Sequence, residues 1–188
     1  MSCPLTSAAA ATGYNIRFRV SGPPGEEILA LAYSAGAVSL LGLVPEDTGL
    51  SRALADGGCV HVALASLILA GHYSSARTAI AGGMPLALAS GYLRNGTASL
   101  NPQFLLYLAC QNLGLTAEEA VVAHTYNAAC SLRFSHVTGS LEPKKAADIC
   151  IMDVDDYHEL VRRAGHHDAY LVMRAGKIVY RRPDVTVE

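Results

Sequence analysis

The chain has 188 residues, of which 51% are hydrophobic and only 16% are charged. Its 14 Lys and Arg residues nearly balance its 16 Asp and Glu residues, which gives a formal net charge of -2. This composition excludes an intrinsically disordered chain, because such chains combine low hydrophobicity with high net charge. It also argues against a nucleic-acid partner, because phosphate binding needs a basic stripe and the basic residues are scattered until the last third of the chain.

The sequence contains no clear membrane or export signal. The longest apolar stretch, residues 59–70, is shorter than the ~20 residues that a membrane-spanning helix needs. The N-terminal residues lack the basic and apolar regions of a signal peptide. Five cysteines lie far apart and form no CxxC pair. These features predict a reduced, cytoplasmic chain without a membrane segment.

Short apolar runs alternate with helical patterns in the first half of the chain. The apolar runs bounded by Gly or Pro predict buried strands at residues 16–20, 37–44, 59–65 and 85–89. The patterns between them predict helices at residues 26–34, 49–56 and 74–81. This order predicts an α/β fold with a parallel sheet and helical crossovers.

The second half changes character. Helices are predicted at residues 102–113, from the N-cap Thr116 to about Ala123, and at residues 126–132. A strand at 148–152, a helix at 156–163 and a hairpin of 170–174 with 177–181 are predicted after them. The chain therefore ends in a β-rich segment.

Two segments of this β-rich region carry a family pattern. Residues 139–149 read GSLEPKKAADI, and residues 172–180 read VMRAGKIVY. They resemble the turn, strand and hairpin near the C-terminal end of the amidohydrolase superfamily. Residues 113–120 (LGLTAEEA) and 125–129 (TYNAA) are similar to two helices of the same superfamily.

Two further details resemble the imidazolonepropionase family, whose members act in histidine degradation. They are Asn95-Gly96-Thr97, and Tyr157 followed by Gly165-His166-His167. The resemblance covers residues 16–182 and implies a hydrolase of cyclic amide C–N bonds on a TIM-like (β/α)₈ barrel. Family members are twice as long, so the fold that it implies is half of the barrel, equivalent to strands five to eight, plus a small C-terminal β segment.

This resemblance predicts three regions. Residues 1–15 form a flexible N-terminus, residues 16–135 form the truncated barrel portion, and residues 136–188 form a β-rich segment that packs on it. The resemblance also implies metal ligands at strand ends: an early H-x-H pair, a histidine on strand five, a histidine on strand six and an aspartate on strand eight.

The retained ligand positions have changed. Where the family reads KIHADE, DHLEY and ATDFN, this chain reads RFRVSG (17–22), LLGLV (40–44) and ASGYL (89–93). Arg19 or a neighbour replaces the first histidine, and Gly91 replaces the aspartate, which is also the usual general base. Glycine has no side-chain donor, and Arg does not ligate metals at working pH. We therefore expect no metal, no cofactor and no catalytic residue in this chain, although the family uses zinc or iron.

Asn95, Gly96 and Thr97 are the candidate substrate-binding residues. In the resembled family, this loop offers backbone N–H groups and a hydroxyl to the substrate carboxylate, and Gly96 would permit close backbone approach. A small carboxylate is therefore the expected ligand. An ordinary Asn-Gly turn is the alternative interpretation.

The histidines outside these motifs have structural interpretations. His61 and His72 match no common metal pattern, which favours structural or loop roles. His124 lies late in a helix, where a partly charged imidazole offsets the helix dipole. His166 and His167 lie near His158 and Asp168, but adjacent residues on a strand point to opposite faces, which favours a surface turn.

Three functional hypotheses follow from the resemblance. The leading one is an imidazolonepropionase-like homologue without metal-dependent activity of its own, a pseudoenzyme. The second is one part of a split or truncated hydrolase that is active only with a partner. The third is a non-catalytic module that binds a small carboxylate or serves as a scaffold. Four strands from a closed barrel leave two unpaired edges and an apolar inner face, so we expect a homo-oligomer or a missing barrel half as the partner.

Overall fold

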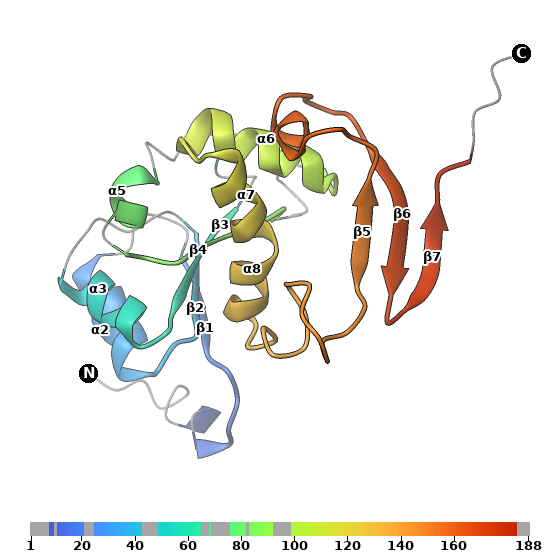
Figure 1. The fold of residues 1–188 in the computed structure, drawn as a ribbon. Coiled ribbons are helices and arrows are strands. Elements are labelled where there is room, and N and C mark those ends of the chain that lie inside the picture. The colour runs from blue at the N-terminus through green and yellow to red at the C-terminus, as the bar shows by residue number, and fades with distance from the viewer. Residues whose placement is uncertain are drawn as a thin grey trace, which may run out of the picture.

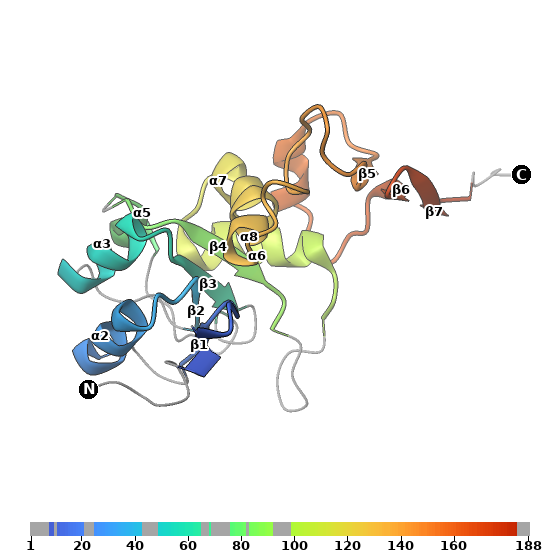
Figure 2. The ribbon, with the colours of Figure 1, turned by 90° about the horizontal axis from the view of Figure 1, so that it is seen from below.

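The computed structural model describes the chain in eight ranges: residues 8–9, 11–20, 25–42, 49–64, 68, 76–81, 83–91 and 99–183. Two sheets dominate its architecture, and the helical segment of residues 102–131 lies between them in both views (Figure 1, Figure 2). None of the helices in this described part is long and apolar enough to cross a membrane.

The first sheet has four parallel strands, and their order in space, β1-β2-β3-β4, is their order along the chain. The strands are β1 (Arg17–Arg19), β2 (Ser39–Leu41), β3 (Val60–Leu64) and β4 (Leu86–Ala89). The helices between them are α2 (Glu26–Ser34), α3 (Gly49–Asp56) and α5 (Arg77–Ala81). This arrangement confirms the α/β class, and no closed barrel forms among the described residues.

The strand expected at residues 37–44 is shorter than predicted and ends at Leu41. Gly42 follows it with a φ of 143°, which is a conformation that residues with a Cβ rarely adopt. The local backbone therefore leaves the extended form there, although the sequence remains apolar through Val44.

One face of the parallel sheet packs against α2 and α3. Neighbouring strands bring Phe18, Leu40, His61 and Leu86 into one row across the sheet. Buried apolar side chains fill the space between this face and the two helices: Leu29, Ala32, Ala37, Leu40, Leu54 and Cys59. These side chains come from the apolar runs of the strands and from the apolar positions of the helices, so the sheet face and the helices pack directly together.

The opposite face carries a second apolar row, and the helix α8 (Tyr126–Ser131) packs against part of it. Val60, Val62 and Leu64 are at most 6% exposed, and Ala87 is fully buried. Ala128 and Cys130 of α8 contact this cluster. Part of the inner face that was expected to be open is therefore covered within the chain itself.

The helices α6 (Pro102–Leu113) and α7 (Ala117–His124) complete the main core. Asn101 caps α6, because its side-chain oxygen accepts hydrogen bonds from two backbone N–H groups of the first turn. Thr116 and Glu119 form a reciprocal capping box at the start of α7, which confirms the N-cap prediction. Both helices bury apolar side chains against β3 and β4.

The second sheet is antiparallel, with the order β5-β6-β7. Its strands are β5 (Ile149–Met152), β6 (Ala169–Arg174) and β7 (Lys177–Arg181), so the predicted hairpin is confirmed. The helix predicted at 156–163 is instead a single 3₁₀ turn, η1 (Tyr157–Val161). Asp156 caps this turn, and one turn is enough to bury Leu160 and Val161 in the main core.

Candidate functional site

Active sites on (β/α)-type sheets lie at the carboxyl ends of the parallel strands, where the loops after the strands meet. In this chain the described residues at those ends are Arg19, Gly42, Leu64 and Ser90 with Gly91. A guanidinium and one hydroxyl are the only polar side chains among these five residues. The set therefore lacks the imidazole and carboxylate groups that bind divalent metals.

The end of β2 has no room for a side chain. A Cβ placed on Gly42 would lie 2.4 Å from the carbonyl oxygen of Val20. The Val20 N–H donates to the Leu41 carbonyl at 2.8 Å, which fixes the two chain segments next to each other. A ligand side chain at Gly42 would therefore require the backbone to move.

The end of β4 leads to the candidate substrate-binding loop. Asn95, Gly96 and Thr97 lie outside the described residues, so their binding role stays a prediction. Asn101 follows this loop in the sequence. Its side-chain N–H donates to the His166 carbonyl oxygen at 2.9 Å, and its side-chain oxygen caps α6. One side chain thus ties the exit of this loop to the segment before β6.

The described residues do not gather the side-chain donors that a metal site needs. Among these residues, no group of three or more His, Cys, Asp or Glu side chains is close enough to hold a metal ion. The described residues therefore do not fit the metal centre that the resemblance implies. His72 lies outside the described part of the chain.

His61 lies in β3 with its ring buried on the face that packs against α3. It is 3% exposed, and neither ring nitrogen has a hydrogen-bond partner of good geometry among the described residues. Burial lowers the pKa of His61 to about 4, and the nearby Gly42 backbone offsets only part of this effect. The ring is therefore neutral at pH 7. It borders a cavity of about 10 Å³ together with Cys59, Met84 and apolar side chains.

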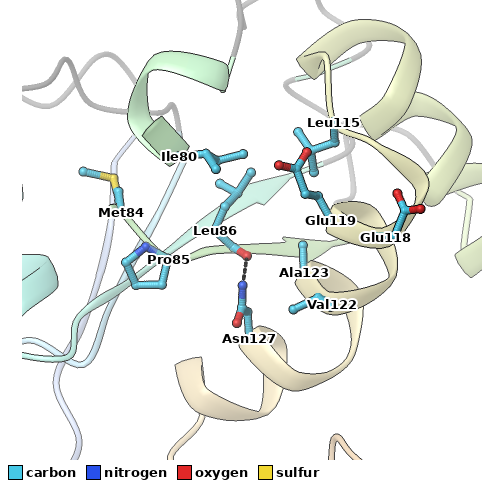
Figure 3. Close-up of a pocket in the computed structure, with 10 residues that line it drawn as sticks. All are labelled: Ile80, Met84, Pro85, Leu86, Leu115, Glu118, Glu119, Val122, Ala123 and Asn127. Carbon is cyan, nitrogen blue, oxygen red and sulfur yellow. Dashed lines mark hydrogen bonds between the residues drawn. The ribbon is translucent and has the colours of Figure 1, made fainter. Parts of the chain in front are cut away.

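A larger pocket, of about 240 Å³, opens at the amino end of β4 (Figure 3). Its walls come from α5, the residues before β4, and the helices α7 and α8. Asn127 of α8 donates to the Leu86 carbonyl oxygen at 2.8 Å and fixes α8 against the start of the strand. The pocket lies at the end of β4 opposite to the one where the catalytic loops of such folds meet.

Two carboxylates border this pocket, and both already have partners. Glu119 accepts two hydrogen bonds from Arg77, which lowers the pKa of this carboxyl group. Glu118 accepts a hydrogen bond from the Tyr157 hydroxyl at 2.6 Å, which is the main cause of its pKa falling to about 2. Apart from Asn127, whose side-chain N–H donates to Leu86, the remaining lining is apolar, so this pocket offers no free acid or base for catalysis.

The histidines near the C-terminus are separated in space. His158 Nδ1 lies 2.7 Å from Asp156 Oδ1, and its Nε2 lies 3.4 Å from Glu118. His166 is 3.9 Å from Asp168, whereas the His167 ring packs edge-on against Tyr180. The exposed positions of His166 and His167 agree with the predicted surface turn.

The interpretation of His124 needs correction. It ends α7 as predicted, but burial lowers the pKa of its imidazole, and the Leu88 backbone offsets this only in part. A neutral ring does not offset the helix dipole by charge. The helical pattern alone gave no sign that α7 would partly bury its last residue.

A buried pair that no sequence pattern predicts links α6 to Asp168, the residue before β6. The Gln103 side-chain N–H donates to Asp168 Oδ2 at 2.7 Å, and the Asp168 backbone N–H donates to Gln103 Oε1 at 3.1 Å. Gln103 is 2% exposed and Asp168 is 7% exposed. Arg163 lies 3.6 Å from the same carboxylate oxygen and adds a positive charge. This pair is structural, and it orients the segment that holds His166.

Comparison with known proteins places the chain in a family. The profile of the amidohydrolase family matches residues 31–179. The chain is 36% identical over 152 residues to the imidazolonepropionase of Geobacillus kaustophilus, covering 79% of this chain and 36% of that protein. It is 33% identical over 181 residues to the imidazolonepropionase of Solibacter usitatus, covering 95% and 43%. The chain thus spans less than half the length of these curated relatives.

Solved structures share the fold at lower sequence identity. The ochratoxinase of A. niger matches with a TM-score of 0.75 and 23% identity, over 95% of this chain and 44% of that chain. The atrazine chlorohydrolase of Arthrobacter aurescens, complexed with zinc and atraton, matches with a TM-score of 0.70 and 19% identity, over 97% and 48%.

The zinc in that structure corrects one expectation. The prediction of no metal or cofactor is wrong, because a solved enzyme with the same fold binds zinc. The described residues still bring no ligand group together, so the ligands of such a metal do not meet within this part of the chain. The matching profile covers most of the chain, and the chain belongs to the amidohydrolase family.

Proposed function

We propose that this chain forms the half-barrel portion and the C-terminal β segment of an imidazolonepropionase-like amidohydrolase, and that it does not hydrolyse cyclic amides by itself. Its curated relatives are imidazolonepropionases, which supports the substrate class and a link to histidine degradation. The sequential order of four parallel strands supports equivalence to strands five to eight of a barrel, because barrel strands follow one another around the ring.

The observation that carries this proposal is the chemistry at the carboxyl ends of the strands. A metal-dependent hydrolase needs a bound water whose pKa is lowered to about 7, and imidazole and carboxylate ligands hold the ion. The described strand ends carry Arg19, Gly42 and Gly91, none of which has an imidazole or carboxylate, and the backbone at Val20 fills the space beside Gly42. These glycines supply neither an imidazole or carboxylate ligand nor a general base.

This chain's own contribution to a site is substrate binding at the end of β4. In this proposal, Asn95, Gly96 and Thr97 offer backbone N–H groups and a hydroxyl to a small carboxylate. The Asn101 side chain supports the exit of this loop through its bond to the His166 carbonyl and its cap on α6. Backbone N–H groups that converge on one point can bind an anion, and fixing their position beforehand reduces the cost of binding.

A split enzyme is the second candidate, favoured by the length comparison. The chain spans 36–43% of the two imidazolonepropionases described above. In this version, a second polypeptide pairs with the free edges of β1 and β4, completes the barrel and brings metal ligands. The pair would then hydrolyse the substrate although this chain alone does not. A homo-oligomer formed across the same edges is the other way to cover them.

Two measurements on the purified chain test these proposals. In the first, the purified chain is supplied with zinc or iron, and its bound metal is determined. Ring opening of imidazolone propionate is then followed, with the Geobacillus kaustophilus enzyme as the positive control. We expect no turnover above the buffer rate, and turnover with one bound metal per chain would contradict the leading proposal. The second is a thermal-shift titration with imidazolone propionate and urocanate. We expect the parent to be stabilised and Gly96→Val to show no shift; equal responses would contradict binding at this loop.

A further inference from the structure

The outer edge of β7 is unpaired within the described part of the chain. β7 is the last strand of the order β5-β6-β7, and no described strand pairs with its far side. All five of its residues are exposed, including Ile178 at 53%, Val179 at 61% and Tyr180 at 39%. Figure 2 shows this edge facing away from the rest of the molecule. An exposed apolar edge strand is a template for pairing with another chain.

The ends of β7 carry positive charges that pair with no residue in the described part of the chain. Lys177 begins the strand and Arg181 ends it, and neither side chain forms an ion pair or a hydrogen bond with a described residue. Arg182, the next residue, differs because it pairs with Asp153. The free edge of β7 therefore has an apolar centre, with the positive charges of Lys177 and Arg181 at its two ends.

Pairing of β7 with β7 of a second copy is disfavoured by these charges. In an antiparallel pair centred on Val179, Lys177 of one copy would lie opposite Arg181 of the other at both ends. Like charges directly opposite each other destabilise a strand pair. The strand that fits this edge must instead have an apolar centre and acidic ends.

The chain itself contains such a segment. Residues 184–188 read Asp-Val-Thr-Val-Glu, with carboxylates at both ends and β-branched residues between them. In an antiparallel arrangement its acidic ends face the basic ends of β7, and β-branched residues favour a strand. We propose that residues 184–188 of a second copy dock against the free edge of β7, and that the two copies do so reciprocally.

The same chain cannot easily fold this segment back on its own β7. The Arg182 N–H donates to the Tyr170 carbonyl at 2.8 Å, so the chain still follows β6 at this residue. A return along the free edge would require a two-residue turn at Arg182-Pro183. A type I′ turn needs a positive φ at both positions, which the Pro183 ring excludes, and a type II′ turn needs it at Arg182, which a residue with a Cβ rarely adopts. A second copy supplies the segment without this turn.

Reversal of charge tests the proposal by sedimentation velocity of the full chain. We expect the parent to form dimers, and we expect both Lys177→Glu/Arg181→Glu and Asp184→Lys/Glu188→Lys to be mainly monomeric. Combining all four substitutions in one chain restores opposite charges and should restore the dimer. An equimolar mixture of the two charge variants should also associate more than either alone.

Several results would overturn the proposal. A parent that is monomeric at high concentration, or a dimer that tolerates both charge reversals, would show that another surface or no surface is used. A monomer that loses stability on charge reversal would mean that the segment folds back on its own β7. Arg52→Glu, an exposed charge change on α3, is the matched control and should leave association unchanged. Circular dichroism of each variant checks that the fold is retained.

Discussion

Replacing Gln103 by Leu removes the buried link between α6 and β6 and keeps the volume of the side chain similar. The parent makes two hydrogen bonds, one to the Asp168 carboxylate and one from the Asp168 backbone N–H. A buried polar group left without its partner costs about 1–3 kcal/mol, and a charged group costs more. Two groups lose partners here, while Arg163 at 3.6 Å still faces the carboxylate. We therefore expect a loss of about 2–4 kcal/mol.

Urea unfolding followed by circular dichroism measures this loss, and the slope with urea should stay the same because the surface exposed on unfolding is similar. The matched control is Gln111→Leu, on the same helix but exposed to solvent, which should change stability by less than about 0.5 kcal/mol. Equal effects of the two substitutions would refute the assignment of this buried pair. A loss confined to the Gln103 variant supports it.

Three further substitutions test the burial of His61, the cap of α7 and the packing of Leu113. Burial lowers the pKa of His61 from 6.5 to about 4, so the unfolded chain binds the proton at a higher pH than the folded chain. The free energy of unfolding should therefore fall by about 3 kcal/mol as the pH drops from 6.5 to 4. Urea titrations should give a shallower fall for His61→Leu and a parental fall for exposed His136→Gln; identical profiles would contradict the burial of the ring. Thr116→Ala should cost about 1 kcal/mol in the same assay by removing the capping box, and an unchanged midpoint would refute that cap. Leu113→Ala should cost about 2–5 kcal/mol in thermal unfolding because this side chain is fully buried, and a melting temperature that matches the parent would contradict this packing.

Local signals predicted much of the fold. The helices at 26–34, 49–56 and 102–113 have the predicted bounds, because acidic first-turn residues, the Gly57-Gly58 stop and the Asn101-Pro102 start are chemical features of the chain itself. The alternation of predicted strands and helices was enough to predict that the four strands form a parallel sheet. The predicted strand bounds were too long where the end depends on tertiary contacts, as at Gly42.

The long-range features were beyond the reach of sequence patterns. Gln103 and Asp168 lie 65 positions apart, and no spacing rule brings them together. The neutral state of His124 follows from packing against β4, which helical periodicity does not reveal. The pocket beside Asn127 also arises from segments that are distant in the chain. The changed ligand motifs were visible in the sequence, and they led to the expectation of no metal, which the zinc complex of the same fold contradicts.

The most direct test of the central claim is metal-dependent turnover by this chain alone. The purified chain, loaded with zinc, is mixed with imidazolone propionate, and ring opening is followed together with bound zinc per chain. The account predicts no turnover above the buffer rate, because the strand ends at Gly42 and Gly91 supply no ligand and no general base. Turnover that rises in proportion to one bound zinc per chain would contradict it.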